Sequence, residues 1–181
     1  MFDGKIWKTD VVADALAEGI SVAAASSGKV FVSSIDSRSK SLRISTFDMG
    51  KWDSEVIDSE NRYIGPTSVA LTQSNDPRIF VYTLGVNSLR IFANHGGVWV
   101  PQVVNEPGGY QVSGAVSAKG LLACASMNGT MAMLSLSKGK TWTHYSFKGL
   151  GKLNGPNALD FNGDSLPVFV VSGLNDQGLN L

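Results

Sequence analysis

The chain has little that would support a disulfide framework, a nucleic-acid surface or a membrane span. Its one cysteine, Cys124, excludes an internal disulfide and a cysteine-cluster metal site. Its 15 acidic and 15 basic residues balance, whereas nucleic-acid-binding proteins usually carry a basic face. The longest apolar runs, such as Val168 to Val171, are far too short to cross a bilayer. We therefore expect neither a nucleic-acid partner nor membrane insertion.

The sequence also lacks the motifs of a targeted protein or of a common enzyme. The N-terminus, MFDGKIWKTD, has no apolar stretch of the kind found in signal peptides. This predicts a cytoplasmic protein, or one secreted without a recognisable signal peptide. No phosphate-binding glycine loop, metal-spaced histidine pair or nucleophile elbow occurs. Because no catalytic constellation is recognisable, we expect a protein that is not an enzyme. We expect it to be folded, since 43% of its residues are hydrophobic and only 17% are charged.

Four tryptophans recur at a nearly constant interval along the chain. The gaps between them are 45, 47 and 43 residues, and a glycine stands two or three residues before each. The tryptophans are Trp7, Trp52, Trp99 and Trp142. An interval of about 45 residues is typical of the four-stranded blades of a β-propeller.

The segments between the tryptophans repeat as well. About 13 residues after each tryptophan comes a segment of small residues with a glycine near its start, aligned on Gly19, Gly65, Gly114 and Gly155. Two strand-like runs follow, separated by polar turns such as SNDP and NDQG, and Asn128-Gly129 is a hairpin signal. Each unit thus predicts four short antiparallel strands. The fold class is all-β, a β-propeller of four blades, with small residues on crowded inner strands.

The two ends of the chain are in phase with this repeat. From Trp142 to Leu181 is 39 residues, and seven more lead from Met1 to Trp7. We therefore expect one domain, residues 1–181, whose ring is closed by the N-terminal strand. The repeats are approximately 5–50, 51–97, 98–140 and 141–181, the last completed by residues 1–12. A four-bladed ring, half of an eight-bladed dimer and part of a longer array all fit, so a homo-oligomer stays open.

The segment from Pro77 to Trp99 resembles a blade of the fungal and bacterial fucose-binding propeller lectins. The resemblance implies that Arg78 contacts sugar and that Trp99 stacks on it. The family carries a glutamate after a second arginine, where this chain has Ile91 after Arg90. Extended to the other repeats, the predicted carbohydrate-binding residues are Arg43, Trp52, Arg78, Arg90, Trp99 and Trp142.

Two further resemblances concern turns. SLSKGKTW, Ser135 to Trp142, is similar to the Asp-box of sialidase-type propellers, which lies away from the catalytic centre and so indicates fold. DFNGD resembles the start of the calcium loops of integrin-type propellers, which would place calcium on Asp160, Asn162 and Asp164. A solvated hairpin is the alternative, because Val168 stands where the closing acid belongs. No other cofactor is predicted.

Three functions fit these patterns. The first is a lectin that binds glycans or glycoproteins through multivalent shallow sites between blades, since weak repeated sites add by avidity. The second is a non-catalytic protein-interaction scaffold, a role that many propellers serve. The third is a fragment of a sialidase-like glycoside hydrolase. A lectin should show half-exposed tryptophans in pockets with polar neighbours, whereas a scaffold should bury them as wedges.

Overall fold

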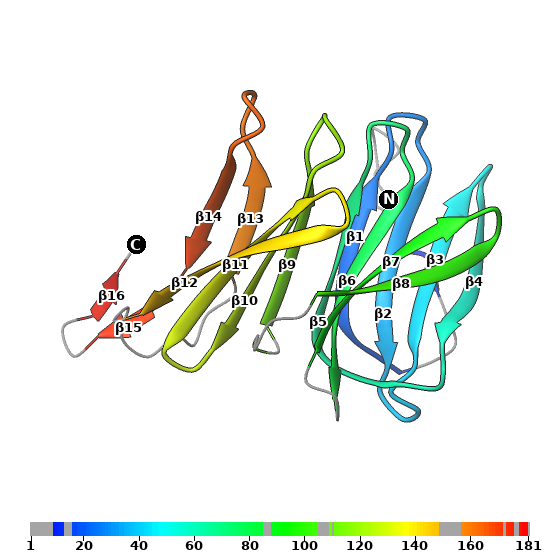
Figure 1. Ribbon diagram of the computed structural model, residues 1–181. Coiled ribbons are helices and arrows are strands. Elements are labelled where there is room, and N and C mark those ends of the chain that lie inside the picture. Colours follow the sequence, from blue (N-terminus) through cyan, green and yellow to red (C-terminus); the bar gives the residue numbers. More distant parts are fainter. Residues whose placement is uncertain are drawn as a thin grey trace.

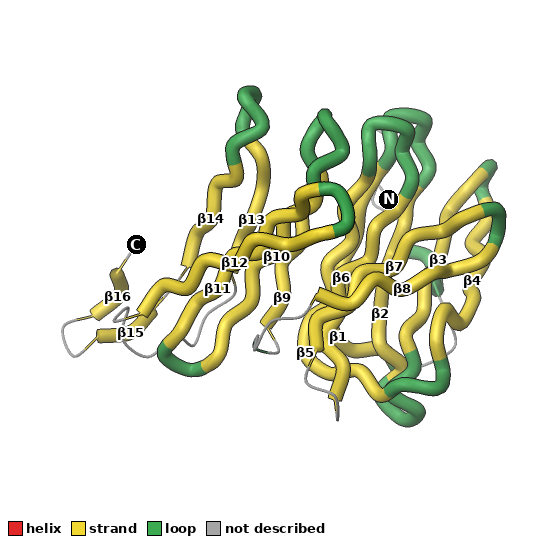
Figure 2. The backbone as a smooth tube through the Cα atoms, viewed as in Figure 1, coloured by secondary structure: helices red, strands yellow, loops and turns green. Residues whose placement is uncertain are grey.

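The computed structural model describes residues 9–12, 16–84, 88–104, 109, 111–148, 157–171, 173–175 and 178–180. Every regular element in this part of the chain is a β-strand (Figures 1 and 2). It contains no helix long and apolar enough to cross a membrane. The prediction of an all-β fold is confirmed for these residues.

Three four-stranded antiparallel sheets follow one another along the chain, each built by pairing every strand with the next. Sheet I contains β1 (Ala17–Ala24), β2 (Val30–Asp36), β3 (Leu42–Asp48) and β4 (Lys51–Asp58). Sheet II contains β5 (Arg62–Leu71), β6 (Pro77–Leu84), β7 (Ser88–His95) and β8 (Val98–Val104). Sheet III contains β9 (Gln111–Val116), β10 (Leu122–Asn128), β11 (Met131–Lys138) and β12 (Thr141–Lys148). Two hairpins come last: sheet IV, made of β13 (Asn157–Phe161) and β14 (Pro167–Val171), and then β15 (Gly173–Asn175) with β16 (Gly178–Asn180).

The sheets stand side by side in a row, with sheet I at one end and the last hairpins at the other (Figure 1). The first strands of successive sheets, β1, β5, β9 and β13, contact one another. The buried apolar side chains fill the spaces between neighbouring sheets: one cluster joins sheets I and II, a second joins II and III, and a third joins III and IV. This stacking is consistent with propeller-like blades.

One tight turn occurs four times, between the first two strands of every sheet. It spans residues 25–29, 72–76, 117–121 and 162–166, and in each copy the same two backbone hydrogen bonds close it. Its fourth residue has a positive φ: Gly28, Asn75, Gly120 and Ser165. Because the copies are 47, 45 and 45 residues apart, this turn aligns the four repeats residue by residue.

A second turn explains why glycine precedes tryptophan. The outer hairpins of sheets I to III have two-residue loops, since Asp48 pairs with Lys51, His95 with Val98 and Lys138 with Thr141. Such loops need a positive φ, which Gly50, Gly97 and Gly139 supply. The tryptophan then begins the outer strand.

The glycines of the inner strands fall into two kinds. Gly19 and Gly65 lie at β-bulges, and no Cβ would fit at Gly19 because the carbonyl of Gly65 occupies that space. Gly114, which the sequence alignment grouped with them, is instead equivalent to Val22 and Val69. Its Cα lies against the ring of Phe80, so it is glycine for a packing reason. That part of the alignment was wrong.

The predicted closure of the ring by the N-terminal strand is not seen. Residues 1–8, including Trp7, lie outside the described residues, and residues 9–12 form no strand. The Val12 carbonyl accepts a hydrogen bond from Ser54 Oγ of β4 at 3.1 Å, so this segment lies beside sheet I. Sheet IV stands toward the other end of the row (Figure 1). The physical reason is reach, because only four residues separate Val12 from β1, about 13–17 Å of extended chain.

Candidate functional site

A cavity of about 650 Å³ opens between sheets I and II, at the end where the inner turns and the outer hairpins lie. Sheet I contributes the β1–β2 turn and residues of β2, β3 and β4, and sheet II contributes the β5–β6 turn and the β7–β8 hairpin. The lining is mixed: Phe31, Ile44, Pro77 and Trp99 are apolar, whereas Lys29, Asp48, Glu55, Ser74, Asp76 and Asn94 are polar. Small-molecule sites commonly combine an apolar wall with a few polar groups in this way.

Trp99 forms the wall that sheet II presents to this cavity. The indole packs against the buried cluster between sheets I and II and remains half-buried. Its Nε1 donates a hydrogen bond to Glu55 Oε1 of sheet I at 2.9 Å. The side chain is therefore both a wedge between two sheets and a partly exposed aromatic surface, which joins the two roles that the sequence left as alternatives.

The polar groups around Trp99 are held by local bonds. Lys29 Nζ pairs with Asp48 Oδ2 at 2.9 Å on the sheet I side. On the sheet II side, Ser74 Oγ donates to Asp76 Oδ2 at 2.7 Å, and Asn94 Oδ1 accepts from the Gly97 N–H at 2.8 Å. The cavity thus presents oriented carboxylate, ammonium and amide groups beside an indole.

A partly buried charged network lies at the corner where sheet I passes into sheet II. Asp58 Oδ2 accepts from the Tyr63 hydroxyl at 2.6 Å and from Asn61 Nδ2 at 2.8 Å, and Arg90 Nη1 lies 3.9 Å from the same oxygen. Burial alone would raise the pKa of Asp58, but the hydrogen bonds it accepts outweigh burial and lower that pKa. Burial and the bond to Asp58 both raise the pKa of Tyr63. This network positions the two sheets that form the cavity.

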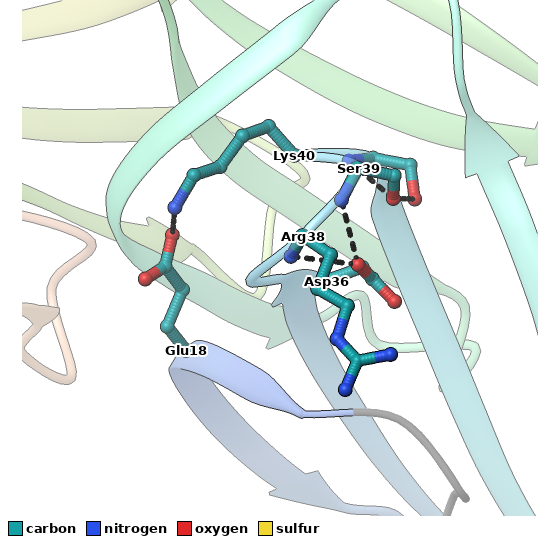
Figure 3. Close-up of polar contacts among 6 residues, drawn as sticks. Glu18, Asp36, Arg38, Ser39 and Lys40 are labelled. Atoms are coloured by element: carbon teal, nitrogen blue, oxygen red, sulfur yellow. Dashed lines mark hydrogen bonds and ion pairs between the residues drawn. The ribbon is translucent and has the colours of Figure 1, made fainter.

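Another polar cluster, shown in Figure 3, stabilises the turn between β2 and β3. The Asp36 carboxylate accepts hydrogen bonds from the backbone N–H groups of Arg38 and Ser39 at 2.9 and 2.8 Å. These bonds, first that of Ser39 and then that of Arg38, lower the pKa of Asp36. Lys40, which has a positive φ, pairs with Glu18 across the turn. The β2–β3 turn is at the opposite end of β2 from Lys29, so it takes no part in the cavity.

The predicted residues of sheet I face the other way. Arg43 and Trp52 lie on the face of sheet I that points away from sheet II, and the Trp52 ring packs at 5.3 Å from Phe47. Within the described residues, Arg43 Nε and Trp52 Nε1 are buried without a hydrogen-bond partner. Arg90 is on the same face of sheet II as Trp99 but belongs to the Asp58 network.

Arg78 and Trp99 lie on opposite faces of sheet II. In the strand register Arg78 shares a row with Ala93, whereas Trp99 shares the neighbouring row with Asn94. Arg78 Nη1 donates to the Pro77 carbonyl at 3.0 Å. The turn alignment makes Arg78 equivalent to Phe31, which lines the cavity. Arg78 therefore faces sheet III. The tryptophan on that side is Trp142, a half-buried indole packed between sheets II and III, and not Trp99.

The predicted calcium residues lie on β13 and its turn. Asp160 is exposed, and its Oδ1 accepts the neighbouring Phe161 N–H. Asn162 Oδ1 accepts the N–H groups of Asp164 and Leu166, as the side chains of Thr72 and Ser117 do in equivalent turns. Across the described residues, no group of three or more histidine, cysteine, aspartate or glutamate side chains could hold a metal ion. Calcium binding there stays a prediction.

Sequence reasoning identified Trp99 but missed the groups around it. Lys29, Asp48, Glu55, Asp76 and Asn94 carry no repeated pattern. Each stands, however, within a few residues of a repeated turn. A search for polar residues flanking the four inner turns and three outer hairpins would have found most of them.

Comparison with known proteins shows a likeness of fold alone. No protein-family model matches the chain, and no curated protein matches its sequence. Among solved structures, a fucose lectin from Kordia zhangzhouensis in complex with methyl-fucoside is similar, with a TM-score of 0.52 and 14% sequence identity. The match covers 72% of this chain and 99% of the lectin chain. The two proteins are therefore alike in the arrangement of their strands.

Proposed function

We propose that the protein is a non-catalytic carbohydrate-binding protein of the β-propeller type, and that glycans or glycoproteins are its partners. One observation carries the proposal. The half-buried indole of Trp99 forms the apolar wall of a cavity that also holds oriented carboxylate, ammonium and amide side chains. The fold likeness to a lectin solved with methyl-fucoside adds support.

The chemistry of this cavity suits a sugar ring. A pyranose has one apolar C–H face and a rim of hydroxyl groups, so it needs an aromatic surface beside hydrogen-bonding groups. Trp99 offers the surface. Asp48 and Asp76 can accept hydroxyl hydrogen bonds, and Lys29 can donate. Glu55 bonds the indole N–H and so fixes the orientation of the ring.

The proposal is tested by binding of the labelled protein to a broad glycan array, with methyl fucoside as the first soluble competitor. We expect a set of related glycans that wild type binds and Trp99→Ala does not. Trp142→Ala is the matched control, because it removes the equivalent indole of sheet III, which does not line the cavity.

Retained binding in Trp99→Ala with circular dichroism like that of wild type would contradict the proposed site. A blank array at high protein concentration would contradict sugar binding altogether. The protein-interaction scaffold would then be the better account, and partner capture the next experiment.

A further inference from the structure

At the two ends of the row of sheets, strand positions are exposed whose equivalents elsewhere in the row are buried between two sheets. The first such position faces the preceding sheet. It is occupied by Val69 in sheet II and Leu159 in sheet IV, both buried, and by Gly114 in sheet III, which is packed against Phe80. In sheet I it is Val22, and 65% of that residue is exposed.

The opposite end of the row shows the same contrast on the face that meets the following sheet. One position there holds Ser33, Phe80 and Ala125 in sheets I to III, and all three are fully buried. Its equivalent in sheet IV is Val170, which is 52% exposed. Val168, two residues earlier on the same face, is 51% exposed, whereas its equivalents Phe31 and Ala123 are buried and Arg78 is half-buried.

The polar groups on the outward face of sheet I differ from their equivalents only in part. Trp99 Nε1 donates to Glu55, and Arg90 lies near Asp58; both partners belong to the preceding sheet. In the described part of the chain, Trp52 Nε1 and Arg43 Nε of sheet I are buried without a partner, as are Arg90 Nε of sheet II and Trp142 Nε1, which lies between sheets II and III. The exposed Val22, and not these N–H groups, therefore gives this face the character of half an interface.

The segment before β1 already occupies part of that face. The Val12 carbonyl is bonded to Ser54 of β4, so the segment lies beside the outer strand of sheet I as β4 itself lies beside β8. In the sequence, Asp10 stands three residues after Trp7, as Glu55 stands three residues after Trp52. Val12 therefore lies where the outer strand of a preceding sheet would lie, while no inner strands of such a sheet occur among the described residues.

We propose that a second copy of the chain supplies the missing inner strands. Sheet IV of one copy packs on the outward face of sheet I of another, beside residues 9–12. The two faces are the two halves of an interface that the chain forms three times within itself, so their shapes and apolar surfaces are complementary. Formal net charge is zero, so two copies do not repel each other. The contact is head-to-tail, and it joins copies into a ring or a chain according to its rotation. Trp52 then lies between two sheets, as Trp99 does.

The test is the mass of the 181-residue chain by light scattering after size exclusion, at micromolar concentration. Wild type should have a whole-number multiple of the mass of one chain. Val22→Lys and Val170→Lys should each be monomeric, and both should fold because each side chain is half or more exposed in the single chain. Val100→Lys, on an exposed valine of β8, is the control and should assemble like wild type.

Mixing the two variants makes the test specific for head-to-tail contact. Val22→Lys retains an intact sheet IV and Val170→Lys an intact sheet I face, so the mixture should form pairs that neither variant forms alone. A monomeric wild type would overturn the proposal and favour closure within one chain. Assembly that persists in both variants would overturn it by showing that other faces associate. If Val170→Lys fails to fold, a Val22→Cys and Val170→Cys mixture replaces it: an interchain disulfide supports the contact, and its absence contradicts it.

Discussion

Trp99 and Trp52 occupy equivalent positions in sheets II and I, yet their surroundings differ. Trp99 is bonded to the neighbouring sheet and lines a cavity, whereas Trp52 faces outward with its N–H buried and unpaired among the described residues. The local sequence builds both alike, through a two-residue hairpin followed by an outer strand. The contrast teaches that the repeat specifies a half-site, which a neighbouring sheet completes only where it places an acceptor, since Trp142 Nε1 is unpaired although the indole packs between sheets II and III.

The largest expected effect on stability is at an interior position, compared with the equivalent position at the end of the row. Phe80→Ala should lower the free energy of unfolding by about 3–5 kcal/mol, because Phe80 is fully buried between sheets II and III. In the Val22→Lys background, where the chain should be monomeric, Val170→Ala at the equivalent half-exposed position should cost less than about 1 kcal/mol. Urea unfolding measures both, and equal losses would contradict the assignment of sheet IV as an end.

Removing the carboxylate at the corner of sheets I and II should have the next largest effect. Asp58→Ala leaves the buried Tyr63 hydroxyl without its acceptor, which should cost about 1.5–3 kcal/mol of unfolding free energy. Asp164→Ala removes an exposed carboxylate and should change stability by less than about 0.5 kcal/mol. Chemical denaturation of the two variants separates a structural charge from a solvated one.

The same carboxylate predicts a pH dependence. The folded-state pKa of Asp58 is below its usual value of 3.8, so its contribution to stability is present above that value and is lost as pH falls through the folded pKa. Unfolding free energy should therefore fall in the acid range, and Asp58→Asn should flatten this fall. A residual slope should remain, because the pKa of Asp36 is also lowered. An unchanged slope in Asp58→Asn would contradict the network.

The hydrogen bond of Trp99 predicts a smaller difference. In a double-mutant cycle, Trp99→Phe and Glu55→Ala should show a coupling energy of about 1 kcal/mol, since the phenyl ring cannot donate to the carboxylate. The matched cycle of Trp52→Phe with Glu55→Ala should show none. Coupling in both cycles would mean that the two indoles are not as different as the structure shows.

The smallest effect concerns the outer hairpins. Met49 has a φ of 47° and is almost wholly exposed, whereas Gly96 holds the equivalent place in sheet II. Met49→Gly should raise the unfolding free energy by about 0.5–1 kcal/mol, because the strained left-handed conformation is relieved. Gly97→Ala, with a φ of 91°, should lower it. Thermal unfolding of both variants provides the measurement.

The parts of the structure that the sequence predicted are those set by local rules. The interval between Trp52, Trp99 and Trp142 predicted four-stranded units, and the small residues predicted crowded inner strands. Non-local features were not predictable. Whether Trp99 faces sheet I or sheet III depends on strand register, and its bond to Glu55 joins residues 44 positions apart. The grouping of Gly114 with Gly19 was wrong because a bulge glycine and a packing glycine look alike in sequence.

The measurement that tests the central claim most directly is the two-dimensional NMR spectrum of the tryptophan indole N–H groups during titration with methyl glycosides, methyl fucoside first. Single tryptophan-to-phenylalanine variants assign the four signals. We expect the Trp99 signal to shift and saturate, while those of Trp52 and Trp142 stay in place. If the Trp99 signal does not move with any sugar at millimolar concentration, or if all four move together, the cavity between sheets I and II is not a carbohydrate site.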